Sequence, residues 1–334
     1  MKRRTPISLA RLMTARVLGR RFPASIGMIV THRCNLRCAY CGFPDLPSDE
    51  MDADQWLEAI HAFLQAGTLR MGFSGGEPLL RQDLDRLLKA AHGNALVTLN
   101  TNGLLLPERK DLLKWVDAAV ISLDGNQEVH DGLRGQGAYA GAVQGGEAVL
   151  KAGKKLIFAM VVTKDNTNQI PHVLRLSEDM GAQCFFQPVT PCAVSSGKAA
   201  SMLPDLDEFK RGVRFLQAAK RRGKPVCCSR SYLESLMRYP NATIEKAQCK
   251  LGLYGGFVTP SGQVCRCHVN LGVDAAPSGR DLGFVEAFRR MPMTDCQGCF
   301  IYPYVELSNL LSGKLLPIYD ALRQATIGWR SAGE

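Results

Sequence analysis

The chain has 334 residues, with 41 Lys plus Arg against 31 Asp plus Glu, which gives a formal charge of +10 at pH 7. Its 46% hydrophobic and 22% charged residues are typical of a globular fold and exclude a low-complexity or disordered chain. No uninterrupted apolar run approaches the roughly 18 residues of a spanning helix, so we expect no transmembrane helix.

The first 22 residues carry most of the net positive charge. They hold seven basic residues and no acidic one, so +7 of the +10 lies here and only +3 on the rest of the chain. We therefore expect no nucleic-acid partner for the body of the protein. Residues 7–22 predict a basic amphipathic helix that ends before Pro23. Three hypotheses remain for it: packing on the body, contact with an anionic membrane or an acidic substrate, or an organellar transit peptide.

Strand and helix patterns alternate from Ser25 onward. Apolar runs predict six strands, at 25–31, 69–75, 95–101, 118–125, 156–163 and 182–189. Helical patterns lie between them, at 52–66, 84–91, 104–115, 139–152 and 170–180. Apolar strands joined by helical crossovers indicate a parallel sheet. We expect an α/β fold, a partial (β/α)6 TIM-like barrel with its site at the carboxyl ends of the strands.

The pattern changes after about residue 190. One more helix is expected at 206–222, and residues 249–305 then carry five cysteines among short β-like pieces. This indicates a small cysteine-rich C-terminal α+β domain. The predicted division is a basic segment, a core barrel, a helical connection, a cysteine-rich domain and a helical tail, at 1–24, 25–200, 201–248, 249–310 and 311–334.

Cys34, Cys38 and Cys41 form a CxxxCxxC arrangement just after the first predicted strand. Clustered cysteines without a secretory signal favour a metal site in a reducing, cytoplasmic setting over disulfides. Three thiolates in one short loop can hold three irons of a [4Fe–4S] cluster and leave the fourth iron open to a small molecule. The alternative is a zinc site completed by a residue such as His32.

Several ordered motifs accompany these cysteines: Tyr40 before the last Cys, SGGEPLL at 74–80, NTNG at 100–103, SLDG at 122–125 and HDGLRG at 130–135. Together they resemble the radical S-adenosylmethionine (radical SAM) superfamily, over roughly residues 25–190 and the cysteine-rich tail. The resemblance implies a [4Fe–4S] cluster on the three cysteines and bound S-adenosylmethionine (SAM). Its reductive cleavage would give a 5′-deoxyadenosyl radical that removes hydrogen from a C–H bond.

The resemblance also implies the SAM-binding residues, which are Tyr40, Gly75, Gly76, Glu77, Asn100, Asn102, Ser122, Asp124 and Arg134. Glycines would let the backbone approach the ligand closely, and Arg134 would pair with the SAM carboxylate. Taken singly, each of these residues also suits an ordinary structural role. A GGEP segment can form a surface turn, strand-end polar residues can cap helices, and Arg134 could form a surface salt bridge.

The tail resembles the twitch (shortened SPASM) extension of radical SAM enzymes. The resemblance implies an auxiliary [4Fe–4S] cluster on Cys249, Cys267, Cys296 and Cys299. Cys265 is a rival for Cys267, although the spacing from Gly262 favours Cys267. Structural zinc is the alternative for this set. A saturated auxiliary cluster cannot activate SAM, but it can take an electron from a substrate radical, which favours a net oxidation.

Three functions are compatible with these motifs. Relatives that mature ribosomally made peptides often carry an N-terminal peptide-recognition domain, and only about 24 residues precede the first strand. We therefore expect a small-molecule, cofactor-precursor or lipid-like substrate, with peptide maturation as the alternative. A non-catalytic iron–sulfur electron carrier is the third hypothesis, and a carrier needs no SAM pocket. The expected partner is a reductant such as flavodoxin or ferredoxin. Gln187 and Cys192 are the candidates for quenching the substrate radical, because they lie at the predicted strand ends.

Overall fold

A computed structural model gives the fold of the protein. It describes residues 4–47, 49–191, 197–241, 249–268, 271, 275–293 and 299–312. Two residues named above, Cys192 and Cys296, lie outside the described residues, as does nearly all of the predicted tail at 311–334.

Within the described residues, one eight-stranded sheet organises the fold, in the order β6-β5-β4-β3-β2-β1-β7-β8. All neighbours pair in parallel except β7 and β8, which are antiparallel. The strands are β1 (Ser25–Ile29), β2 (Arg70–Ser74), β3 (Leu96–Thr101), β4 (Ala118–Ser122), β5 (Lys155–Val162), β6 (Gln183–Pro188), β7 (Gly255–Val258) and β8 (Val264–Cys265). The predicted six strands and the partial barrel are confirmed, and the sheet is not closed.

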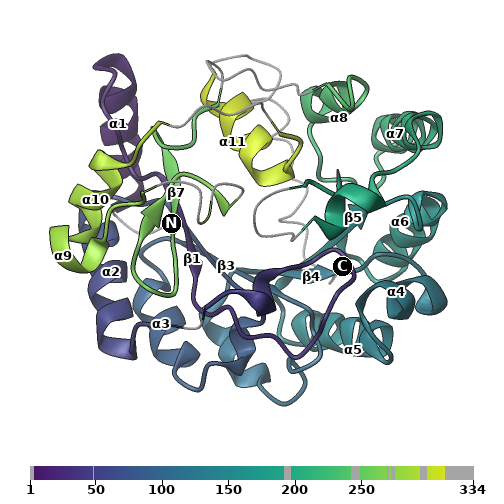
Figure 1. Cartoon of the computed structure of the whole chain (residues 1–334), viewed down its shortest axis with the longest axis horizontal. Helices are drawn as coiled ribbons and strands as arrows, with labels where there is room; N and C mark the ends of the chain where they lie inside the picture. Colours follow the sequence, from purple (N-terminus) through teal and green to yellow (C-terminus); the bar gives the residue numbers. More distant parts are fainter. Residues whose placement is uncertain are drawn as a thin grey trace.

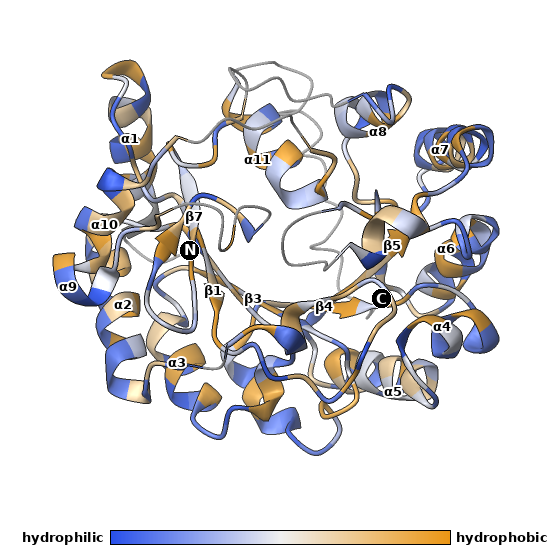
Figure 2. Ribbon diagram, in the orientation of Figure 1, coloured by the Kyte–Doolittle hydropathy of each residue, from blue (hydrophilic) through white to orange (hydrophobic). Residues whose placement is uncertain are grey.

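Helices cover the outer, convex side of this curved sheet (Figure 1). The helices of the described residues are α1 (Arg4–Val17), α2 (Ala53–Ala66), α3 (Leu84–Ala91), α4 (Gln127–Arg134), α5 (Ala138–Lys151), α6 (Ile170–Asp179), α7 (Leu206–Arg221), α8 (Arg230–Leu236), α9 (Gly279–Leu282), α10 (Phe284–Arg290) and α11 (Tyr302–Leu311), of which α11 does not lie on the convex side. The crossover helices α2, α3, α5 and α6 turn their buried apolar residues to the sheet, and Figure 2 shows hydrophilic residues on their outer faces. Among the described residues, no helix is both long and apolar enough to cross a membrane.

Local sequence explains where the crossover helices begin and end. Asp52 caps α2, because its side chain accepts a hydrogen bond from Gln55 N. The Gln55 side chain in turn accepts a hydrogen bond from Asp52 N. Gly67, with φ of 101°, ends the same helix in the left-handed conformation that glycine adopts without strain. Asp52 and Asp54 both suit a helix cap by residue type, and Asp52 is the one that caps α2.

Two predicted helices differ from the structure. The segment predicted as a helix at 104–115 is a series of turns followed by a short 3-10 helix at Lys110–Trp115. Pro107 lacks the N–H that a helix interior needs, and this prediction was wrong. The basic N-terminal helix ends at Val17, before Gly19 with φ of 62°, rather than continuing to Pro23. Helix α4 was not predicted.

The C-terminal segment is built onto both edges of the open sheet. Strand β7 pairs with β1, so the cysteine-rich segment continues the barrel sheet. Helix α11 contacts the opposite edge, where the Tyr302 ring stacks on Phe185 of β6 at 4.3 Å between centroids. Figure 1 shows α11 across the opening between the two edges. The segment thus spans the gap between the two edges of the open sheet.

Candidate active site

The three N-terminal cysteines lie on a loop that leaves β1 at the carboxyl edge of the sheet. The loop is tied to the body through backbone bonds, including Ala39 N to Leu133 O at 2.8 Å. All three thiols are half-buried. Burial raises the pKa of each thiol, that of Cys41 to about 11. A metal centre would have to offset this cost of forming thiolates, as metal binding commonly does.

The glycine pair after β2 packs directly against this loop. Gly76 N donates to Thr31 O at 2.8 Å, and Glu77 N donates to Arg33 O at 2.8 Å. A Cβ on Gly75 would lie 2.2 Å from Thr31 O, and one on Gly76 would lie 2.3 Å from Arg33 O. Gly75 also has φ of 153°. Both positions therefore require glycine for the strand end to approach the cysteine loop.

A cavity of about 230 Å³ opens between the loop and the strand ends. Its wall includes ten of the residues that the sequence analysis assigned to the cluster and to SAM, which are Cys34, Cys38, Tyr40, Cys41, Gly75, Gly76, Asn100, Asn102, Ser122 and Arg134. The donor set fits the family's groups, because three thiols share the cavity with backbone, amide and hydroxyl groups suited to a polar nucleotide. The cavity lies where parallel α/β barrels place their sites.

Glu77 lies beneath the cavity rather than on its wall. Its side chain is fully buried and accepts from Thr101 Oγ1 and Asn102 N, both at 2.8 Å, and from Leu79 N at 3.1 Å. Burial raises the pKa of this carboxyl to about 7 despite the three donors. The carboxyl joins the end of β2 to the end of β3, which holds Asn102 in place. The Asn102 side chain in turn donates to Asn35 on the cysteine loop at 2.7 Å.

A second buried carboxyl, Asp124, binds two residues of the cavity wall. Asp124 Oδ2 accepts from Tyr40 Oη and from Arg134 Nε, both at 2.6 Å. Burial acts to raise the pKa of Asp124, but the neighbouring Arg134 guanidinium holds it below its usual range. Arg134 is buried as well, and its Nη1 lies 3.9 Å from Cys38 Sγ. Next to the thiols, the cavity is therefore bordered by a buried ion pair in which Asp124 neutralises the charge of Arg134.

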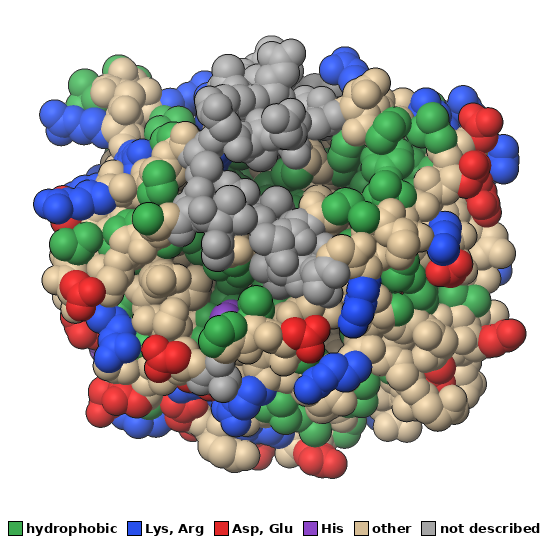
Figure 3. All heavy atoms as spheres, viewed as in Figure 1, with side chains coloured by type: hydrophobic (Ala, Val, Ile, Leu, Met, Phe, Trp, Pro, Cys, Tyr) green, Lys and Arg blue, Asp and Glu red, His purple; other side chains and the backbone are tan. Residues whose placement is uncertain are grey.

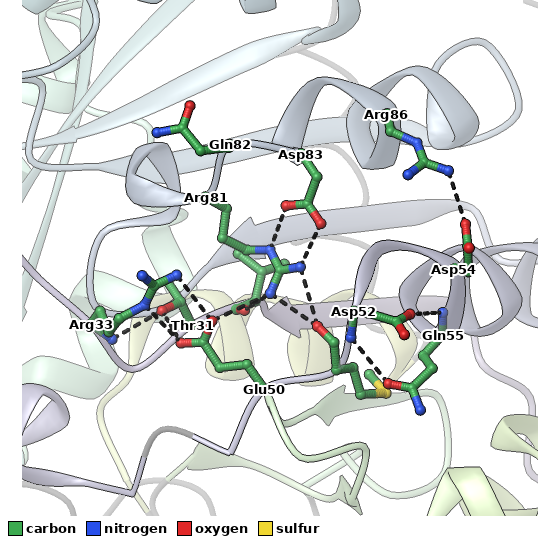
Figure 4. Close-up of polar contacts among 12 residues, drawn as sticks. Thr31, Arg33, Glu50, Asp52, Asp54, Gln55, Arg81, Gln82, Asp83 and Arg86 are labelled. Atoms are coloured by element: carbon green, nitrogen blue, oxygen red, sulfur yellow. Dashed lines mark hydrogen bonds and ion pairs between the residues drawn. The ribbon is translucent and has the colours of Figure 1, made fainter.

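Charged residues below the loop fix its exit toward α2 (Figure 4). The buried Arg81 donates to Val30 O and Met51 O and pairs with Glu50 at 3.4 Å. Glu50 also accepts from Thr31 Oγ1 and pairs with Arg33 at 3.2 Å. Both ends of the cysteine loop are thereby bonded to one arginine that follows β2.

A second cavity, of about 170 Å³, lies next to the first, and Tyr40 and Cys41 line both. Its wall is mostly apolar and includes Phe43, Val161, Pro188, Val189 and Ile301, with the polar side chains of Gln187, Thr190 and His268. His268 Nδ1 bonds to Tyr304 Oη, and the side-chain carbonyl of Gln187 accepts from Tyr302 N at 3.0 Å. Residues of the C-terminal segment thus contribute to the wall of this cavity.

The tail cysteines separate into two places. Cys267, Cys249 and Cys299 belong to one cluster of side chains, with Leu251, Ile301 and Tyr304. Cys265 lies within β8, its sulfur 3.7 Å from Phe257 O of β7. Cys296 is outside the described residues. Nowhere in the described part of the chain do three His, Cys, Asp or Glu side chains meet closely enough to surround one metal ion.

Three residues of the site, His268, Tyr304 and Arg81, were not predicted from the sequence. The signal for His268 was its place directly after Cys267, while Tyr304 carried no recognisable motif. Arg81 follows the GGEP segment by three residues, but only the fold shows that it bonds both ends of the loop.

Comparison with known proteins agrees with this geometry. The model of the Radical SAM superfamily matches residues 28–177. PqqA peptide cyclase of Gluconobacter oxydans is 29% identical over 263 residues, which cover 74% of this chain and 70% of that protein. Pre-heme d1 synthase of Dinoroseobacter shibae is 31% identical over 211 residues, 59% of this chain and 52% of that protein.

A solved structure shares the fold. The crystal structure of Streptococcus suis SuiB bound to S-adenosylmethionine superposes with a TM-score of 0.69 at 18% identity, over 85% of this chain and 70% of that one. At this identity the likeness concerns the fold alone, and it includes the partial barrel described above.

Proposed function

This chain is a radical SAM enzyme, and on that premise we propose that it removes a hydrogen atom from a peptide substrate. The observation that carries the proposal is the similarity to PqqA peptide cyclase, which extends over 74% of the chain and so beyond the matched domain. The relatives therefore favour peptide maturation, the alternative of the sequence analysis, over the small-molecule substrate expected there.

The family implies a [4Fe–4S] cluster and SAM. When bound, the cluster and SAM supply one chemistry: the reductive cleavage of SAM to a 5′-deoxyadenosyl radical that can remove hydrogen from a C–H bond. We assign Cys34, Cys38 and Cys41 as cluster ligands, because their thiols share one cavity wall. The rest of that wall, from the glycine pair at 75–76 to Ser122, would hold the nucleotide.

Arg134 and Asp124 would serve this site as a unit. Asp124 neutralises the guanidinium and orients it, and Tyr40 donates to the same carboxylate oxygen. A guanidinium next to Cys38 favours the thiolate form of that cysteine. The pair would also keep the Tyr40 ring fixed between the two cavities.

The second cavity would hold the group that loses hydrogen. It shares Tyr40 and Cys41 with the first cavity, so a side chain inside it lies next to the proposed nucleotide site. Its apolar wall excludes water from the reacting carbon. Gln187 and His268 provide hydrogen-bonding groups for the polar end of such a side chain.

We also propose an auxiliary [4Fe–4S] cluster on Cys249, Cys267, Cys296 and Cys299, in a twitch-like domain at 249–310. The grouping of Cys249, Cys267 and Cys299 around Tyr304 supports this set. Held by these four thiols, the cluster would supply an acceptor for one electron in a net oxidation of the substrate, with one proton released to solvent. An external reductant such as flavodoxin or ferredoxin would supply the electron that cleaves SAM.

A small-molecule substrate is the second candidate function. The similarity to pre-heme d1 synthase, at 31% identity, favours it, although the match covers only 52% of that protein. The two candidates differ in what fills the second cavity.

The test uses the full chain, reconstituted without oxygen and incubated with SAM and dithionite. The expected result is 5′-deoxyadenosine, and its loss in the C34A/C38A/C41A variant. Short peptides encoded beside this gene are then added, and the expected product has lost two hydrogen atoms by mass. If no SAM is cleaved, the enzyme assignment fails. If SAM is cleaved but small molecules alone are changed, the peptide assignment fails.

A further inference from the structure

Helix α1 packs on the body through one narrow face. Ser8, Leu12 and Ala15 are buried, and the two apolar members of this set join a cluster with Phe22, Tyr254 and Leu311. These positions are three or four residues apart and so lie on one side of the helix. Figure 1 shows α1 at the upper left edge of the molecule, outside the barrel.

The opposite face of α1 is apolar and exposed. Leu9, Met13 and Val17 follow one another at a spacing of four residues, with exposed fractions of 45%, 53% and 82%. Ile7 and Leu18 add two more side chains, exposed by 57% and 55%. In the described part of the chain, these five are a large share of the exposed large hydrophobics. An apolar surface gathered on one element marks an interaction site.

Arginines border this face. At about 100° per residue, Arg11 and Arg16 fall on the two boundaries between the packed and the exposed face. Within the described residues, Arg16 and Arg20 have neither a hydrogen bond nor an ion pair through their guanidinium groups. No acidic residue occurs between Arg4 and Phe22, and the sequence adds Lys2 and Arg3 just before them. Figure 3 shows basic and hydrophobic side chains together on this part of the surface.

We propose that the exposed face of α1 binds the surface of an anionic lipid bilayer. Apolar side chains of this arc would enter the region between head groups and acyl chains, with the helix lying in the plane of the surface. Arginines at the borders can extend their guanidinium groups outward to lipid phosphates, while the apolar stems of these side chains lie along the apolar arc. An acidic protein would pair with the arginines, but it would leave the apolar arc without a matching surface.

The experiment measures flotation of the full reconstituted chain with vesicles of phosphatidylcholine alone or with 30% phosphatidylglycerol. Binding is expected to the anionic vesicles and to fall in 0.5 M NaCl. The R16Q/R20Q variant is expected to bind them about 25-fold more weakly, since each arginine near such a surface contributes about five-fold. The M13E/V17E variant is expected to lose binding. The control is Phe215→Glu, which changes a comparably exposed side chain on α7 and is expected to bind like the wild type.

Three results would overturn the proposal: equal binding to neutral and anionic vesicles, equal loss in Phe215→Glu, or no vesicle binding by the wild type. Sedimentation of the same proteins identifies a competing occupant. A wild-type dimer that M13E/V17E converts to a monomer, without vesicle binding, would assign the face to a second copy of the chain. Unchanged SAM cleavage in every variant shows that the fold is intact, because α1 contributes no residue to either cavity.

Discussion

Arg134 directs its Nε to Asp124 Oδ2 at 2.6 Å, and both side chains are buried. The guanidinium is therefore neutralised within the protein before any ligand binds. From the sequence we expected Arg134 to pair with the SAM carboxylate, with a surface salt bridge as the alternative. The salt bridge in the structure is buried, and only the Nη groups on the cavity side remain to face a ligand.

Removing the charge of Asp124 should destabilise the fold. Asp124→Asn leaves Arg134 buried without its counter-charge, and breaking such a pair typically costs about 3–5 kcal/mol. Urea unfolding of the cluster-free protein measures this loss. Asp54→Asn is the matched control, because its partner Arg86 is exposed and such pairs contribute at most about 1 kcal/mol. Equal losses in the two variants would contradict a special role for the buried pair.

Adding one methyl group at Gly76 should displace the cysteine loop. A Cβ there would lie 2.3 Å from Arg33 O and 2.5 Å from His32 O, both rigid backbone atoms. Gly76→Ala is expected to lower stability by about 1–3 kcal/mol, the usual effect of overpacking, and to lower the iron retained by Cys34, Cys38 and Cys41. Iron analysis and urea unfolding check both effects.

The control for that variant is Gly132→Ala in α4, where a Cβ meets no atom within 4 Å. It should keep full iron content and gain slightly in stability, because alanine favours a helix interior over glycine. A Gly76→Ala protein with normal iron content would show that the strand end can move away from the loop.

Local patterns predicted the strands of the barrel because each is a buried apolar run with polar residues at its end. The start of α2 is also local, since the capping partners of Asp52 lie within three residues of it. The pairing of β7 with β1 joins segments about 230 residues apart, and no local pattern specifies it. The partner of Arg134 was also hidden, because the turn of α4 that brings it to Asp124 was not predicted.

Iron content should distinguish Cys267 from Cys265. Cys267 groups with Cys249 and Cys299, whereas Cys265 faces the β7 backbone inside the sheet. In a protein that already carries C34A/C38A/C41A, Cys267→Ser is expected to remove the remaining irons, about four per chain for one cubane cluster. Cys265→Ser should retain them. The reverse result would make Cys265 the ligand, and zinc in place of iron would refute the auxiliary cluster.

Glu77 should make stability depend on pH. Its pKa is raised by burial from 4.5 to about 7, so the folded protein holds a proton that the unfolded chain has lost between these values. The contribution of Glu77 is thus present at low pH and is lost as pH rises through about 7, at up to about 1.4 kcal/mol per pH unit.

Glu77→Gln has no charge to bury, although it loses an acceptor for Asn102 N at every pH. Urea unfolding from pH 5 to pH 8 should therefore show the stability of the wild type falling relative to Glu77→Gln. Glu147→Gln, at an exposed position on α5, is the control and should give a constant difference. A difference that stays constant for Glu77→Gln as well would mean that the three donors keep this carboxyl ionised throughout.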